Sequence, residues 1–257
     1  MKTQQFVVTP AAGKRLIATA IARHEAVVSA LQGGTVVVVA GTTNGYVAEE
    51  LLRATGQADG FSRQRFFRGL TTPPGIVRSA SGRLAEGGRF AGDVVIVKGE
   101  WQRGQTLFEV AEQLRRGDVI LKGANAVNLA DREAAVLIGD PRGGTVAAAL
   151  QAVVGRRVRL IVPVGLEKRV HRKVHELAAL LNAPDAEGAR LLPIPGEIVT
   201  EIEALALLAG VQAELVAAGG VGGAEGAAWL AVRGSTEQLA AARQLIDAVA
   251  AEPPFVL

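Results

Sequence analysis

The sequence contains no cysteine, and this absence excludes several chemistries. Disulfide bonds, cysteine-ligated zinc, iron–sulfur clusters and thiol catalysis all need that side chain. No apolar run approaches the roughly 18 residues that a membrane-spanning helix needs, so we expect no membrane partner. Residues 1–5 are polar and have no apolar core of the kind found in signal peptides, so we expect a cytoplasmic protein.

Charge of one sign is also scarce, since the formal net charge is only +3 over 257 residues. A nucleic-acid-binding face needs clustered Lys and Arg. The densest cluster runs from Lys168 to Lys173 and is typical of a solvated helix face, so we expect no nucleic-acid partner. His171 and His175 lie four residues apart in the same segment. A catalytic zinc site needs three protein ligands, and no His-Glu-x-x-His pattern occurs, so we expect neither a metal nor a cofactor.

Short apolar runs, rich in β-branched residues, alternate with segments of helical periodicity. Runs without polar alternation favour strands that are buried on both faces. Strands that alternate with helices favour right-handed crossovers and a mainly parallel sheet covered by helices. The runs lie at 35–40, 93–98, 119–122, 135–138 and 158–162.

The pattern changes after residue 185, where strands and helices no longer simply alternate. The expected order becomes strand, helix, strand, strand, helix, strand, which is the ferredoxin-like arrangement. Its strands are expected at 191–194, 211–217, 227–232 and 255–257, and its helices at 197–208 and 236–250. We therefore predict an α/β protein, with a Rossmann-like three-layer parallel-sheet domain at 1–185 and a ferredoxin-like α+β domain at 186–257.

The run at 119–122 ends in a group of residues suited to binding a ligand. Lys122 and Gly123 close the expected strand, and Asn125 and Asn128 follow. Ligands of open parallel sheets bind just past the carboxyl ends of strands. A lysine supplies a cation, a glycine allows close approach of the backbone, and asparagines supply neutral hydrogen-bonding groups.

Two glycine-rich turns could supply anion-binding backbone N–H groups. Gly41-Thr-Thr-Asn-Gly45 follows an expected strand and opens a helix, where N–H groups and the helix dipole favour an anion. It lacks the Gly-Lys-Ser/Thr ending of a Walker A loop, and the alternative is an ordinary capped turn. Arg142-Gly-Gly-Thr145 repeats the design with an added cation, although Thr145 could simply cap its helix.

Charged residues follow two other expected strands. Lys98 and Glu100 follow the run at 93–98, and Glu167 and Lys168 follow the run at 158–162. A carboxylate beside ammonium groups could move a proton while lysines stabilise an enediolate; rim salt bridges are the alternative. The glycine-rich run 219–226 leads into a strand instead of a helix, so it is interpreted as a hairpin loop that could cover the site.

Two of these segments resemble one protein superfamily. The strand, Gly41-Thr-Thr-Asn and helix resemble the phosphate-binding loop of the ribose-5-phosphate isomerase, glucosamine-phosphate deaminase and CoA-transferase superfamily. Residues 119–127 resemble the Gly-Ala-Asp-Ala-Val signature of its methylthioribose-phosphate isomerase, initiation-factor regulatory subunit and DeoR-type sensor branch. The resemblance covers most of residues 35–182, and implies a Rossmann-like fold, phosphate binding and a homo-oligomer.

The sequence also departs from that superfamily. Asn125 stands where the isomerase signature has an Asp that takes part in proton transfer, and an amide is not a general base. The catalytic Cys of that branch is absent. In another register, Lys122-Gly-Ala-Asn resembles the Lys-Gly-Gly-Gly loop of ribose-5-phosphate isomerase, and Glu133 then lies near the catalytic Glu of that family. A CoA-transferase would need a nucleophilic Glu on a glycine-rich loop, and Glu225 lies on such a loop.

The sequence thus predicts a pocket for a small phosphorylated or carboxylated metabolite. Three functions stay open: a sugar-phosphate aldose–ketose isomerase, a non-catalytic metabolite sensor or regulatory subunit, and CoA-transferase-like acyl transfer. For the isomerase, the candidate catalytic residues are Glu100 or Glu133 as base and Lys122 as electrostatic stabiliser. The candidate ligand-binding residues are Gly41, Thr42, Thr43, Asn44, Gly45, Lys98, Gly123, Asn125, Asn128, Arg142, Gly143, Gly144, Thr145, Glu167 and Lys168.

Overall fold

A six-stranded mixed sheet forms the centre of the computed structural model, which describes residues 1–68, 71 and 92–255. The strand order is β10-β8-β5-β2-β3-β4, in which β10, β8, β5 and β2 are parallel neighbours and β3 and β4 are antiparallel. The strands are β2 (Thr35–Val38), β3 (Val94–Val97), β4 (Glu100–Trp101), β5 (Val119–Leu121), β8 (Arg159–Pro163) and β10 (Glu197–Val199).

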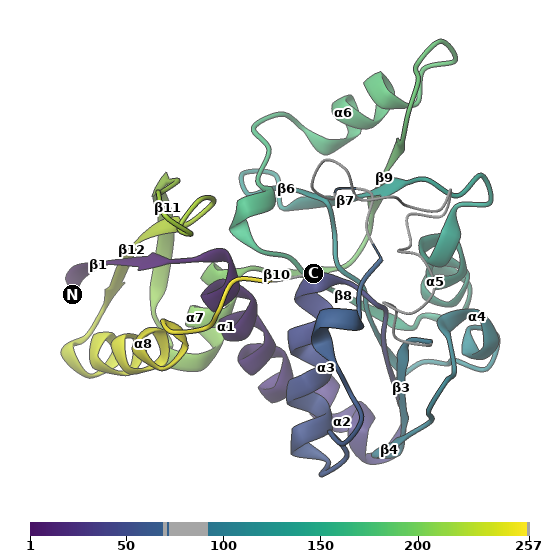
Figure 1. Cartoon of the computed structure of the whole chain (residues 1–257), viewed down its shortest axis with the longest axis horizontal. Helices are drawn as coiled ribbons and strands as arrows, with labels where there is room; N and C mark the ends of the chain where they lie inside the picture. Colours follow the sequence, from purple (N-terminus) through teal and green to yellow (C-terminus); the bar gives the residue numbers. More distant parts are fainter. Residues whose placement is uncertain (69–70, 72–91, 256–257) are drawn as a thin grey trace.

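Both faces of this sheet are covered, which explains why its strands lack polar alternation. Val36 and Val38 pack into one apolar cluster with residues of α1 (Pro10–Arg23), α2 (Glu25–Gly33) and α3 (Thr42–Ala54). Val37 and Val39 pack on the other face with residues of α4 (Leu107–Val110) and α5 (Gly144–Arg156). The helices on the two sides can be followed in Figure 1.

A second sheet of three antiparallel strands packs on the α5 side. Its strands are β6 (Ala126–Asn128), β7 (Glu133–Ile138) and β9 (Arg190–Ile194), and α6 (Val174–Leu181) packs against it. The run at 135–138, expected in the central sheet, is therefore in this separate sheet. A 3-10 helix, η2 (Leu166–Lys168), connects β8 to the segment before α6.

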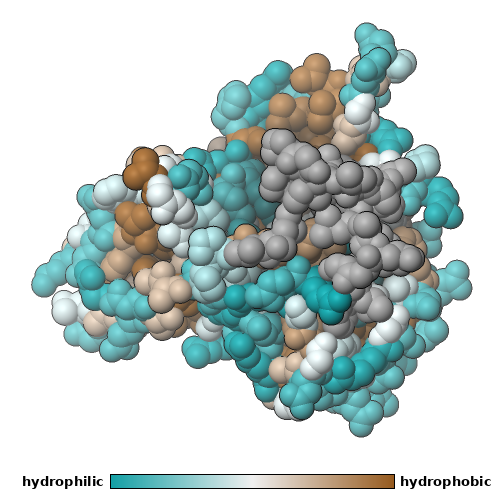
Figure 2. Space-filling view, viewed as in Figure 1, coloured by the Kyte–Doolittle hydropathy of each residue, from teal (hydrophilic) through white to brown (hydrophobic). Residues whose placement is uncertain are grey.

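A third sheet joins the beginning of the chain to its end. β1 (Lys2–Val8) pairs with β12 (Ala228–Gly234), which pairs with β11 (Gln212–Ala218), and all pairings are antiparallel. Helices α7 (Glu201–Ala209) and α8 (Thr236–Val249) pack behind it, at the left of Figure 1. Its other face carries the exposed apolar side chains Val7, Val216 and Trp229, and brown surface is visible over this sheet in Figure 2.

The ferredoxin-like order expected for residues 186–257 is wrong. β9 pairs with β7, β10 joins the central sheet, and the N-terminal β1 takes the place beside β12. Local periodicity specifies which residues form a strand and which face is buried, but not the partner strand. The expected strand at 255–257 lies largely outside the described residues. Within the described part of the chain, no helix is both long and apolar enough to cross a membrane.

Candidate functional site

The four parallel strands of the central sheet end at one edge, which we call the carboxyl edge. Lys122 directly follows β5, and α3 begins four residues after β2. Glu167 and Lys168 lie in η2 after β8, and Glu201 begins α7 after β10. An edge of this kind is where open α/β sheets bind ligands.

A cleft of about 140 Å³ opens at this edge. Five of the candidate residues line it: Lys122, Asn125, Gly143, Gly144 and Thr145. Arg68 and Asp140 also line it, and neither was singled out in the sequence. The structure thus brings together the loop after β5 and the start of α5. The strand-end argument does not explain the position of α5, because the strand before it, β7, is antiparallel and lies in the separate sheet.

Lys122 is a partly buried amine in a cationic setting. Burial and then the Arg68 guanidinium lower the pKa of Lys122 to about 8, while Asp93 acts in the opposite direction. Asp93 is fully buried and fixed by hydrogen bonds from the backbone N–H groups of Ala40 and Leu107, at 2.9 and 2.8 Å. It pairs in turn with Arg68 at 2.8 Å. Near neutral pH, a bound anion would favour the charged amine.

The N-terminus of α5 opens on the same cleft. This 13-residue helix begins at Gly144, and its N-cap residue, Gly143, has no side chain with which to cap it. The first N–H groups of a helix have no intrahelical partner and favour an anion. Gly143 and Gly144 have φ of 82° and 60°, which a residue with a side chain adopts only with strain. Arg142 does not line the cleft: its side chain is 91% exposed, and its backbone N–H donates to Asp140.

The predicted turn at 41–45 forms the start of α3 at the same edge. The Asn44 Nδ2 donates to the carbonyl oxygens of Val39 and Leu121, at 2.7 and 2.9 Å, and so bridges the ends of β2 and β5. Thr43 Oγ1 and Asn44 Oδ1 are buried, and neither has a hydrogen-bond partner among the described residues. Buried polar atoms without a partner are costly, and neither residue lines the cleft.

A second polar group lies farther along the edge, and we call Lys14, Glu167, Lys168 and Glu201 the Glu167–Glu201 cluster. Lys14 Nζ lies 3.0 Å from Glu167 Oε1, and the Leu166 N–H donates to Glu201 Oε2 at 2.9 Å. Burial, and then Glu167, raise the pKa of Glu201 to about 7. Burial acts to raise the pKa of Glu167, but the Lys14 and Lys168 ammonium groups lower it overall. Burial also lowers the pKa of Lys168.

Lys98 and Glu100 lie at the opposite edge, so their expected place beside Lys122 is wrong. β3 runs antiparallel to β2, and Val97 pairs with Thr35, the first residue of β2. The Lys98 N–H donates to the Gly34 carbonyl oxygen, and Glu100 is exposed in β4.

Two other candidates have structural contacts away from the cleft. Glu133 begins β7, and its Oε2 accepts the backbone N–H of Val174 at 2.9 Å, which caps α6. Asn128 is buried and bonds to Arg172 O and Asp131 N. Neither side chain lines the cleft that contains Lys122.

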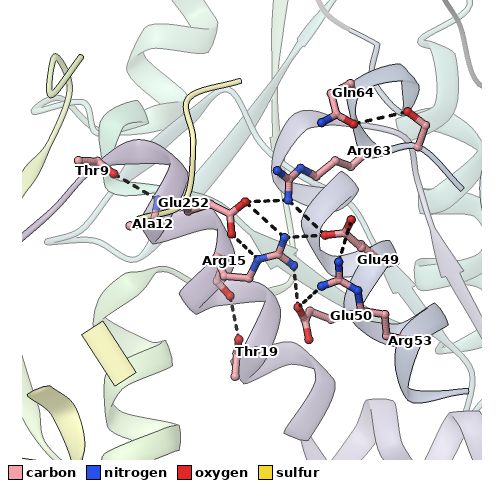
Figure 3. A network of polar contacts seen from close by, with 11 residues as sticks. Thr9, Ala12, Arg15, Thr19, Glu49, Glu50, Arg53, Arg63, Gln64 and Glu252 are labelled. Carbon is pink, nitrogen blue, oxygen red and sulfur yellow. Dashed lines mark hydrogen bonds and ion pairs between the residues drawn. The ribbon is translucent and has the colours of Figure 1, made fainter. Parts of the chain in front are cut away.

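A network of ion pairs holds the helices that carry the edge residues (Figure 3). Arg15 of α1 contacts Glu49 and Glu50 of α3 at 2.5 and 2.6 Å, and Glu252 after α8 at 2.8 Å. Arg63 contacts Glu252 at 2.7 Å. Hydrogen bonds to Glu252 and Glu49 raise the pKa of Arg15 although burial opposes them. The network fixes α1, which carries Lys14, against α3, which carries Asn44.

No protein-family model, curated protein or solved structure matches this chain. The function must therefore be inferred from the chemistry of the carboxyl edge.

Proposed function

We propose that this protein binds a small phosphorylated or carboxylated metabolite in the cleft at the carboxyl edge. One observation carries the proposal: Lys122, an amine whose pKa is lowered, shares a cleft with the N-terminus of α5, whose N-cap residue is a glycine. The anion would be held by the ammonium group, by Arg68 and by the N–H groups of Gly144 and Thr145.

The electrostatics favour an anion over a neutral ligand. Lys122 and Arg68 place two positive groups at one cleft, and Arg68 lowers the pKa of Lys122 even though it is paired with Asp93; the Asp140 carboxylate also lines the cleft. An anion between them would relieve their repulsion and raise that pKa, and ligand binding should therefore take up protons near pH 8. Thr43 Oγ1 and Asn44 Oδ1, which have no hydrogen-bond partner among the described residues, lie beside the same strand ends but do not line the cleft.

We also propose a Rossmann-like domain of the type that the sequence resembles. The parallel order β10-β8-β5-β2 supports it, together with the location of the cleft at the carboxyl edge. A cytoplasmic location is supported by the lack of cysteine, and a homo-oligomer by the exposed Val7, Val216 and Trp229 on the outer face of the third sheet.

Binding without turnover is favoured over isomerisation by the positions of the carboxylates. Glu100 lies at the opposite edge, and Glu133 caps α6. The Asn125 Oδ1 accepts the Leu137 N–H at 3.0 Å, so this amide fixes the cleft wall. Glu225 lies in the exposed hairpin, accepts the Gly223 N–H and does not line the cleft, which disfavours acyl transfer there. Isomerase activity stays the second candidate, with Asp140, which lines the cleft, or Glu167, which lies in η2 at the same edge, as the base.

A ligand-induced stability assay tests the proposal. Thermal unfolding would be measured with inorganic phosphate, ribose 5-phosphate and a dicarboxylate, since a ligand that binds only the folded state raises apparent stability. We expect a concentration-dependent rise in Tm for the wild type and for Lys98→Met, the matched control at the opposite edge, and none for Lys122→Met. An equal rise in Lys122→Met, or no rise with any of these anions in the wild type, would refute the proposal. Turnover of ribose 5-phosphate then separates isomerase from sensor.

A further inference from the structure

Four charged residues from three separate elements converge in the Glu167–Glu201 cluster. Lys14 comes from α1, Glu167 and Lys168 from η2, and Glu201 from α7. Glu201 is only 2% exposed, and the Lys14 and Glu167 side chains are 11% and 18% exposed. Charged groups are seldom buried to this extent unless they are paired or have a function.

The backbone makes room for both carboxyl groups. A Cβ atom added to Gly165 would lie 1.9 Å from Glu167 Oε2, and one added to Gly13 would lie 2.2 Å from Glu201 Oε1. Neither position can carry a side chain while these carboxyl groups stay in place. The base of the hairpin between β11 and β12 packs on the cluster as well, since a Cβ at Gly226 would lie 3.5 Å from Glu167 Cβ.

One acceptor of the cluster is unused. Glu167 Oε1 pairs with Lys14, and Glu201 Oε2 accepts the Leu166 N–H. Glu167 Oε2 is buried and has no hydrogen-bond partner in the part of the chain that the structure describes. An anionic oxygen in this state calls for an O–H or N–H donor.

The cluster and the cleft that contains Lys122 follow neighbouring strands of the central sheet, although no residue of the cluster lines that cleft. β5 and β8 are hydrogen-bonded neighbours, and the Lys122 N–H donates to the Ile161 carbonyl oxygen. Lys168 is close enough for its charge to contribute to the lowered pKa of Lys122. Adjacent strands lie about 4.8 Å apart, so groups that follow β5 and β8 can contact the two ends of one small molecule.

We propose that Glu167, backed by Glu201, is a second subsite for the same ligand, which accepts a hydrogen bond from a hydroxyl or ammonium group. The ligand class is then a phosphorylated or carboxylated metabolite that also carries such a donor a few bonds from its anionic group. This inference rests on the proposed function, because the anionic group occupies the Lys122 cleft. Glu201 acts as a positioning residue that does not touch the ligand.

The charge state of Glu167 and Glu201 distinguishes a ligand with a hydroxyl donor from one with an ammonium donor. Glu201 faces Glu167, Lys14, Lys168 and the Leu166 N–H, and its pKa is raised to about 7. Near neutral pH, part of the population therefore holds a proton on this carboxyl group. An ammonium donor at Glu167 would favour two ionised carboxylates and so release a proton from the cluster, whereas a hydroxyl donor would not.

Two pairs of matched phosphate esters test the inference by isothermal titration calorimetry. Glycerol 3-phosphate is compared with propyl phosphate, and phosphoethanolamine with ethyl phosphate. The wild type should bind at least one donor-bearing ester on the order of tenfold more tightly than its alkyl match, as expected for a hydrogen bond to a charged group. Glu167→Ala should abolish this ratio and leave the alkyl esters bound as before. Lys122→Met should weaken all four esters.

The controls distinguish this inference from the proposed function. If the alkyl esters bind through Lys122 but no donor-bearing ester binds more tightly, the second subsite is refuted and the anion site stands. If Glu167→Ala leaves the ratio unchanged, or weakens alkyl and donor-bearing esters equally, the inference is also refuted. If no ester binds the wild type, both proposals fail. Glu167→Gln, of the same shape, should bind phosphoethanolamine no better than ethyl phosphate, and Glu201→Gln should change the proton release but keep the hydroxyl preference.

Discussion

Replacing Lys122 by Met should stabilise the protein at neutral pH while it removes anion binding. The pKa of Lys122 is lowered from 10.5 to about 8 by burial, and then by Arg68. A difference of about 2.5 units at 1.36 kcal/mol each gives about 3.4 kcal/mol as an upper limit. Because the side chain is only partly buried, solvent screening reduces this, and we expect a gain of about 1–3 kcal/mol.

The sign of the effect fixes the pH range for the measurement. A lysine whose folded pKa is lowered contributes stability that is present above its unfolded pKa, 10.5, and is lost as the pH falls through the folded value of about 8. The unliganded wild type therefore keeps an unfavourable ammonium group at pH 7, and Met does not. Sites built for binding often carry such a cost in stability.

Urea unfolding of the unliganded protein at pH 7 and at pH 10.5 measures the effect. Lys122→Met should be more stable than the wild type at pH 7, and this advantage should shrink at pH 10.5. Lys98→Met, exposed at the opposite edge, should stay within about 0.5 kcal/mol of the wild type. A variant less stable than the wild type at pH 7, or an advantage that does not depend on pH, would show that the lysine is not under this electrostatic strain.

Three further substitutions test other parts of the structure. Glu201→Gln should flatten the pH dependence of stability, because a carboxyl with a raised pKa contributes stability below its unfolded value of 4.5 and loses it as the pH rises through about 7; parallel wild-type and variant curves between pH 4.5 and 8 would contradict this. Glu252→Ala should cost about 1–3 kcal/mol in urea unfolding, because the largely buried Arg15 and Arg63 lose a partner, whereas the exposed control Glu237→Ala should destabilise the protein less than Glu252→Ala does. Glu133→Ala should lower the free energy of unfolding by about 1 kcal/mol, because the N-terminus of α6 loses its cap, and it should leave phosphate affinity unchanged. Weaker phosphate binding by this variant would show that Glu133 contributes to the anion site.

The central strands were predictable because burial on both faces leaves a direct mark on the sequence. The β-branched runs at 35–38, 94–97 and 119–121 form β2, β3 and β5. Strand direction leaves no such mark, and the reversal of β3 moved Lys98 and Glu100 to the opposite edge. Partner choice is equally hidden, since β1 and β12 are more than 200 residues apart in the chain yet pair along their whole length.

The site was predictable only where its residues directly follow parallel strands or start helices. Lys122 and Asn125 follow β5, and Gly143 to Thr145 begin α5, so local pattern was enough to select them. Lys14 and Glu201 lie within segments that read as ordinary helices, and Arg68 follows an apolar pair with no ligand signature. Tertiary packing brings Lys14, Glu201 and Arg68 to the carboxyl edge, and the spacing of residues along the sequence does not reveal such packing.

The most direct test of the central claim is a ¹⁵N-amide NMR titration of the protein with propyl phosphate. The account predicts saturable shift changes at the amides of Lys122, Gly144 and Thr145, with those of Lys98 and Glu100 unchanged. Shift changes centred on Lys98 and Glu100, or none at Gly144 and Thr145 at saturating ligand, would contradict the claim that the carboxyl edge is the anion-binding site.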